Sequence, residues 1–180
     1  MASKQTLVAL VENKPGVLNR VASLFRRRNF NIDSLTVGRT QSEDISRMTI
    51  VVDAGADQVA QHLYKLVNVI KVENITSVPN VSRDLALIKV RVDADTRGQV
   101  IQLCDIFRAH IVDTSSEALI VEVTGDEEKI NSMVEMLRPL GILEMVRTGV
   151  VSMARGDKVF APDDYTPRRT VANGHRASVI

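Results

Sequence analysis

The sequence is poor in the residues that mark several common protein classes. It contains one cysteine, Cys104, so no disulfide can form within the chain, which is typical of a reducing compartment. Aromatic residues make up 3% of the chain, too few for the stacking platforms on which single-stranded nucleic acids bind. No run approaches about 18 consecutive apolar residues, so we expect no membrane-spanning helix.

An excess of charge of one sign is also lacking. The 180 residues include 23 basic and 22 acidic side chains, for a formal net charge of +1. This balance does not favour nucleic acid or an anionic membrane as a partner. The chain starts without a basic and then apolar leader, so we expect a cytoplasmic protein, or a plastid or mitochondrial one if a transit peptide has been removed.

Catalytic and metal-binding patterns are sparse as well. His62, His110 and His175 are scattered along the chain, and none of them has metal-ligand spacing. The sequence has neither a Walker loop nor a G-x-G-x-x-G motif. Cys104 falls on the apolar side of an expected helix and fits a small core residue better than a nucleophile. We therefore predict no catalytic residue, no metal site and no cofactor on this chain.

What the sequence does contain is an alternation of strand-like and helix-like apolar patterns, in the order β-α-β-β-α-β, which then repeats. This order is that of a split βαβ unit of the ferredoxin-like type. The first unit is predicted to have strands at 6–11, 32–40, 45–53 and 69–78 and helices at 17–28 and 56–69. The second is predicted to have strands at 85–92, 111–114, 118–124 and 142–151 and helices at 97–109 and 126–140.

The predicted organisation is therefore an α+β chain of two tandem ferredoxin-like domains, residues 1–78 and 83–158. Residues 79–82 (PNVS) have turn chemistry and are predicted to be a linker. From Met153 onward the periodic apolar pattern is lost, and prolines and charges of both signs replace it. We expect residues 159–180 to be a mostly extended or mobile tail that orders on a partner.

The stretch 12–18 (ENKPGVL) joins the first expected strand to the first expected helix. Such a turn directs backbone N–H groups and the positive end of a helix dipole at one point, which suits a carboxylate. Asn13 is expected to be the N-cap or to form an Asx-turn, and Gly16 to permit the turn. On the local pattern alone, this purely structural explanation is the commoner one.

The expected strand 32–40 lies at a sheet edge in a split βαβ unit, and exposed edges tend to be paired. Two copies joined at this edge bring Asn31 and Ile32 of one copy close to the Asn13–Leu18 turn of the other. The result is a pocket of amide groups and aliphatic walls that suits a free amino acid. Nearby, the basic run 26–28 is predicted to be a solvated helix end, with partner docking as a less common alternative.

Two longer stretches carry a family resemblance. LVENKPGVLNRVASLFRRRNFNIDSLTVGRT, followed by ISRMTIVV, resembles the N-terminal ACT domain of the small regulatory subunit of acetolactate synthase, also called acetohydroxyacid synthase. IFRAHIVDTSSEALIVEVTGDEEKI and then TGVVSMARGDK resemble the C-terminal domain of the same family. The resemblance covers roughly residues 5–158, and the last 22 residues look like an extension.

The resemblance implies a non-catalytic chain that forms a homodimer through its ACT domain. Its partner is the catalytic (large) subunit, which carries thiamine diphosphate, Mg²⁺ and FAD and condenses two pyruvates, or pyruvate with 2-oxobutyrate. The family's small subunit raises that activity and confers feedback inhibition by valine in the biosynthesis of valine, leucine and isoleucine. The effector-binding positions that carry over are Asn13, Gly16, Val17, Leu18, Asn31 and Ile32.

Two alternatives remain open from the sequence. One is an ACT-domain amino-acid sensor that regulates a different partner, such as a transcription regulator, although no helix-turn-helix or basic recognition stripe is visible. The other is a small enzyme on a ferredoxin-like scaffold, against which the lack of convergent titratable groups argues.

Overall fold

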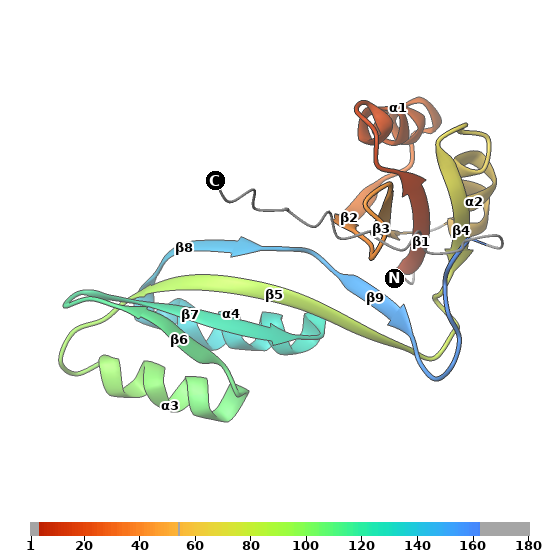
Figure 1. The fold of residues 1–180 in the computed structure, drawn as a ribbon. Coiled ribbons are helices and arrows are strands. Elements are labelled where there is room, and N and C mark those ends of the chain that lie inside the picture. Colours follow the sequence, from red (N-terminus) through yellow and green to blue (C-terminus); the bar gives the residue numbers. More distant parts are fainter. Residues whose placement is uncertain (1–3, 54, 163–180) are drawn as a thin grey trace, which may run out of the picture.

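Two antiparallel sheets, each covered on one face by two helices, make up the chain (Figure 1). The structure is a computed structural model that describes residues 4–53 and 55–162. The strand order of the first sheet is β2-β3-β1-β4, so β2 lies at an edge, as predicted. The elements of this unit are β1 (Gln5–Glu12), α1 (Val17–Arg28), β2 (Ile32–Arg39), β3 (Ile45–Val52), α2 (Ala56–Leu63) and β4 (Val69–Asn74).

The second unit repeats this arrangement, with strand order β6-β7-β5-β8, and one further strand, β9, pairs with β5. The predicted α+β fold of two tandem βαββαβ units is therefore confirmed. The elements are β5 (Asn80–Arg91), α3 (Arg97–Phe107), β6 (His110–Thr114), β7 (Ala118–Gly125), α4 (Glu127–Gly141), β8 (Ile142–Arg147) and β9 (Val151–Ala154).

Each unit has its own hydrophobic core between the sheet and its helices. In β1, side chains alternate between the faces, so Leu7, Ala9 and Val11 point toward the helices, where Phe25 and Leu63 meet them. In the second unit, alternate residues of β5 and β7 pack in the same way against α3 and α4. Because each core is assembled within one unit, the two helical layers are fixed independently of each other.

The second helix is shorter than predicted. It ends at Leu63 rather than extending to residue 69, and Val67, which falls within the predicted helix, is 84% exposed. The hydroxyl of Tyr64 donates to the carbonyl of Val72 (2.7 Å) and accepts from its N–H (3.1 Å). These bonds hold the end of the helix against β4, so the chain turns early.

The last predicted strand, 142–151, is interrupted. Residues 148–150 separate β8 from β9, and Gly149 adopts a left-handed conformation with φ of +83°. The predicted linker is also ordered differently, because Asn80 to Ser82 begin β5 and pair with β9. Met153 and Ala154, which were expected at the start of the irregular region, lie in β9. Within the predicted tail 159–180, residues 163–180 lie outside the described residues.

The break between β8 and β9 brings the second unit against β2. The hydroxyl of Ser34 accepts from the N–H of Val150 (3.2 Å), and that of Thr36 donates to the carbonyl of Thr148 (3.3 Å). Between them a Cβ added to Gly149 would lie 2.5 Å from the Ser34 hydroxyl oxygen. A glycine is therefore required here both by its backbone conformation and by the close approach of β2.

Strand β9 and the chain beyond it return to the first unit and cross the sheet face that the helices leave open. Arg47 donates to the carbonyl of Ser152 (2.7 Å), and Lys71 donates to that of Ala161 (3.0 Å). The ring of Phe160 lies 5.2 Å from the Arg47 guanidinium carbon, within cation–π range. This segment contributes to burying the outer face of the sheet, where Val8 is fully buried.

An ion pair marks the point where β5 changes partners. Asp84 is 2% exposed, and its carboxylate accepts hydrogen bonds from the guanidinium of Arg147 on β8 and, at 3.3 Å, from the hydroxyl of Thr148. Residues 80–83 on one side pair with β9, and residues 84–91 on the other pair with β7. The ion pair therefore lies where β5 passes from pairing with β9 to pairing with β7.

We predict that Asp84→Ala lowers the free energy of unfolding by about 3 kcal/mol, because it leaves the Arg147 charge without its buried partner. Urea denaturation followed by circular dichroism measures this loss. Glu135→Ala is the control, since Glu135 and Arg138 form an ion pair with both side chains 67% exposed, and its loss costs at most about 0.5 kcal/mol. Equal losses in the two variants would contradict the role assigned to Asp84.

We also predict that Gly149→Ala destabilises the chain more than Gly156→Ala. Both glycines have positive φ, +83° and +72°, so both variants carry backbone strain of about 1 kcal/mol. Only the Cβ at position 149 meets another group, and it displaces the Ser34 hydroxyl from the Val150 N–H, which adds about 1 kcal/mol. Equal unfolding midpoints for the two variants would argue against a close contact between β2 and residue 149.

Candidate functional site

The turn between β1 and α1 leaves helix N–H groups uncapped. Gly16, at the N-cap position, has φ of +83° and no side chain bonds to the end of the helix. The helical hydrogen bonds start from the N–H of Arg20, which donates to the carbonyl of Gly16 (3.1 Å). The N–H groups of Leu18 and Asn19 therefore have no acceptor within the helix. No acidic residue lies in the first turn, so the positive end of the helix dipole is not neutralised there.

The side chain of Asn13 makes a different hydrogen bond from the predicted one. It does not cap α1, and its side-chain amide instead donates to the carbonyl of Glu43 (2.8 Å), while its backbone N–H donates to the carbonyl of Asp44 (2.8 Å). These bonds tie the turn to the hairpin between β2 and β3. No side-chain or backbone group in the described part of the chain donates to the Oδ1 atom of Asn13, which leaves this exposed oxygen able to accept from a ligand.

The carboxylate of Glu12, beside the turn, is paired with neighbouring donors. Glu12 accepts from Lys14 (3.0 Å) and from the side-chain amide of Asn68, and Asn68 in turn accepts from Arg20 (2.6 Å). The hydrogen bond from Asn68, followed by that from Lys14, lowers the pKa of Glu12. Lys14 and Arg20 therefore place two positive charges around the Glu12 carboxylate, next to the uncapped start of the helix.

The other predicted site residues lie at the far end of α1. Asn31 and Ile32 follow the helix, so a helix of 12 residues, roughly 18 Å long, separates them from Gly16. The side-chain amide of Asn31 donates to Asp53 (2.7 Å), and Ile32 packs partly buried against the core. A single copy of the chain therefore does not bring the two groups of residues together.

Two neighbouring residues of the predicted site differ in how far they are exposed. Val17 is 5% exposed and belongs to the core, whereas the Leu18 side chain beside it is 48% exposed. A ligand at this turn therefore meets the Leu18 side chain. The β2 edge is compatible with pairing, since no strand covers it within the described residues and Val37 on it is 42% exposed.

The potential metal ligands of the described residues are scattered. Groups of three or more histidine, cysteine, aspartate or glutamate side chains that could hold a metal are absent from this part of the chain. Burial, and to a smaller extent the charge of Asp105, raises the pKa of the Cys104 thiol, which disfavours the nucleophilic thiolate. Nor does the described region contain a helix long and apolar enough to cross a membrane.

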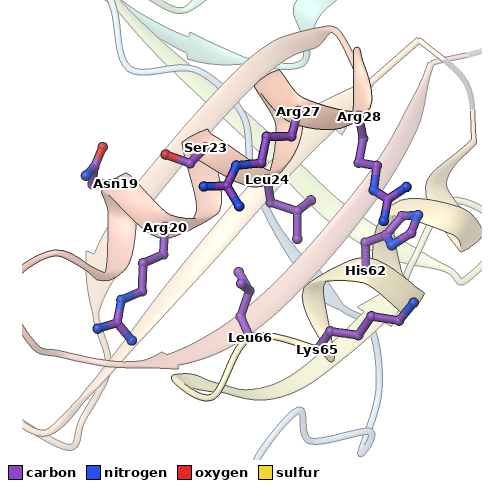
Figure 2. Close-up of a pocket in the computed structure, with 9 residues that line it drawn as sticks. All are labelled: Asn19, Arg20, Ser23, Leu24, Arg27, Arg28, His62, Lys65 and Leu66. Carbon is purple, nitrogen blue, oxygen red and sulfur yellow. The ribbon is translucent and has the colours of Figure 1, made fainter.

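A basic groove between α1 and α2 was not identified as a site from the sequence (Figure 2). Its volume is about 350 Å³. Partial burial, followed by the charges of Arg28 and Lys65, lowers the pKa of His62. In the sequence, the basic run 26–28 was the only indication of this groove, because its other basic residues come from separate segments. The groove is lined by Asn19, Arg20, Ser23, Leu24, Arg27, Arg28, His62, Lys65 and Leu66.

Comparison with known proteins gives the family of both units. Residues 7–71 match the family described as AHAS small subunit-like ACT domain, and residues 83–156 match the small subunit of acetolactate synthase. A probable acetolactate synthase small subunit of Archaeoglobus fulgidus is 53% identical over 158 residues, which are 86% of this chain and 99% of that protein. The acetolactate synthase small subunit of Mycolicibacterium smegmatis is 53% identical over 156 residues, 85% of this chain and 92% of that one.

A solved structure agrees with these sequence matches. The crystal structure of the acetolactate synthase small subunit from Thermotoga maritima superimposes with a TM-score of 0.80 at 40% identity, covering 87% of this chain and 99% of that one. The family models match both units, and the matched part of this chain spans nearly the whole length of these relatives. The chain therefore belongs to the family of acetolactate synthase small subunits.

Proposed function

We propose that this chain activates the catalytic subunit of acetolactate synthase and makes it sensitive to feedback inhibition by valine. It thereby regulates the biosynthesis of branched-chain amino acids. Thiamine diphosphate, Mg²⁺ and FAD are bound by the catalytic subunit, and this chain contributes binding and regulation only. The observation that carries the proposal is the uncapped turn at Gly16, with open N–H groups and no acid in its first helical turn, in a member of this family.

The effector site is formed by two copies of the chain that pair at their β2 edges. The carboxylate of valine accepts from the N–H groups at the start of α1, and its ammonium group donates to the Oδ1 atom of Asn13. The isopropyl group contacts the exposed side chain of Leu18. Asn31 and Ile32 of the second copy complete the pocket. A site shared in this way makes valine a ligand of the dimer rather than of one copy.

Strand β2 is the element that couples this site to the second domain. It begins at Ile32, beside the effector, and its Ser34 and Thr36 bond to residues 148–150 of the second unit. Valine shifts the dimer between two arrangements by as much as it prefers one of them, typically about 1–3 kcal/mol in allosteric proteins. A small movement of β2 is then transmitted to the domain that carries β8 and β9.

Isothermal titration of valine tests the turn directly. We predict that Gly16→Asp weakens valine binding at least about tenfold, because an acidic group at the helix start repels the effector carboxylate. The variant is expected to fold, since nothing lies within 4 Å of a Cβ at position 16 and aspartate tolerates positive φ better than most residues.

Gly156→Asp is the matched control for this titration. Gly156 also has a positive φ of +72° and open space around it, but no helix follows it in the described part of the chain, so an aspartate there does not face the N–H groups of a helix start. It is expected to bind valine as the wild type does. Equal affinities of Gly16→Asp and wild type would exclude the turn as the effector site.

A reconstituted assay of pyruvate condensation tests the regulatory role. We expect this chain alone to be inactive, and the catalytic subunit to be more active with it than without it. Asn31→Ala is predicted to retain the activation but to lose inhibition by valine, because Asn31 belongs to the effector site and not to the core of either unit. Absence of activation by the wild-type chain would contradict the proposed function. Loss of activation in Asn31→Ala with valine sensitivity intact would contradict the role of that residue.

A further inference from the structure

The groove between α1 and α2 collects positive charge that the rest of the chain does not balance locally. Arg20, Arg27 and Arg28 line it from α1, Lys65 and His62 line it from α2 and the following turn, and no acidic residue is among its lining residues. Figure 2 shows Arg28 extending toward His62 across the gap. Over the whole chain the charges nearly cancel, at +1. The groove is thus a local concentration of positive potential on an otherwise balanced molecule.

These cations have few partners of their own. Arg20 is held by the side-chain oxygen of Asn68, at 2.6 Å. Among the described residues, no carboxylate lies within ion-pair distance of Arg27, Arg28 or Lys65. Unpaired, adjacent cations repel one another, and an anionic guest relieves this repulsion. The lowered pKa of His62, caused by partial burial and then by Arg28 and Lys65, agrees with such an environment.

The shape and the floor of the groove favour a polypeptide over a compact anion. The α1 residues that line it include positions 20, 23, 24, 27 and 28, a stripe along one face of the helix that is roughly 12 Å long. Leu24 and Leu66 form an apolar floor between the charged side chains. An elongated groove with an apolar floor and a cationic rim matches an amphipathic segment with acidic residues along its edges.

The groove also stays accessible in the assemblies described above. It opens from the helical layer, whereas residues 148–162 cover the opposite face of the same sheet. Pairing of two copies at the β2 edge uses the edge of the sheet. One molecule can therefore dimerise, contact its own second domain and still present the groove to a third surface.

We propose that the α1–α2 groove docks an acidic, amphipathic segment of the catalytic subunit of acetolactate synthase. This inference rests on the proposed function, because that function supplies the partner. Binding is electrostatically steered, so it weakens as salt concentration rises. The effector turn and the docking groove share α1: Gly16 lies at its start and Arg28 at its end.

Affinity for the catalytic subunit, measured by titration with the full-length chain at low and high salt, tests the groove. Arg27→Glu and Lys65→Glu change two groove residues from different segments, and each is expected to weaken binding about tenfold at low salt. The salt dependence of the remaining binding should also be reduced. Arg26→Glu is the matched control, because it makes the same change on the same helix end but Arg26 does not line the groove. It is expected to bind within about twofold of wild type.

Two further measurements separate the outcomes. Valine titration of each variant shows whether it folds and dimerises, and all three are expected to bind valine as the wild type does. Wild-type association with the catalytic subunit tests the proposed function by itself. If wild type associates but both groove variants do so equally well, or if Arg26→Glu is weakened as much as they are, the groove is not the docking site. Stabilisation by inorganic phosphate that Arg27→Glu abolishes, with unchanged affinity for the catalytic subunit, would identify a small anion as the occupant and overturn the proposal.

Discussion

The change of partners along β5 is the constraint on which the arrangement of the two domains depends. One uninterrupted strand pairs with β9 through its first residues and with β7 and β8 through the rest. The buried carboxylate of Asp84 holds Arg147 and Thr148 at the transition. The path of the chain after β8 is thereby fixed, and residues 148–150 are brought to β2. Without that path, the two domains would be joined by little more than a linker.

Strand β2 has three surfaces with separate roles. Leu35 packs toward the helices and contributes to the core. Ser34 and Thr36 on the other face bond to the second domain, and the outer edge has no partner strand among the described residues. A shift of β2 caused by pairing at its edge therefore also moves Leu35 in the core and the hydrogen bonds of Ser34 and Thr36 to the second domain, since all three residues lie on this short strand.

The sequence predicted elements whose pattern is decided within one segment. Helix 17–28 and the edge position of β2 were correct because the apolar spacing and the order of elements determine them. The second helix was predicted too long, at 56–69, since a bond between Tyr64 and β4 holds its end at Leu63, and no local pattern reports that bond. The hydrogen bond from the Asn13 side chain to the carbonyl of Glu43 was not predicted for the same reason, because Glu43 lies in another segment, the hairpin between β2 and β3. The basic groove could not be predicted without the tertiary structure, because its basic residues come from α1, from α2 and from the turn that follows α2.

The return of the chain to the first domain adds attachments to those made through β5 and residues 148–150. It leaves through β5 at Asn80 and comes back through residues that contact Lys71 and Glu73, where Lys158 forms an ion pair. A body held at several separate points cannot turn freely about any one of them. Rotation of one domain relative to the other therefore requires contacts at β2 or beside β4 to break.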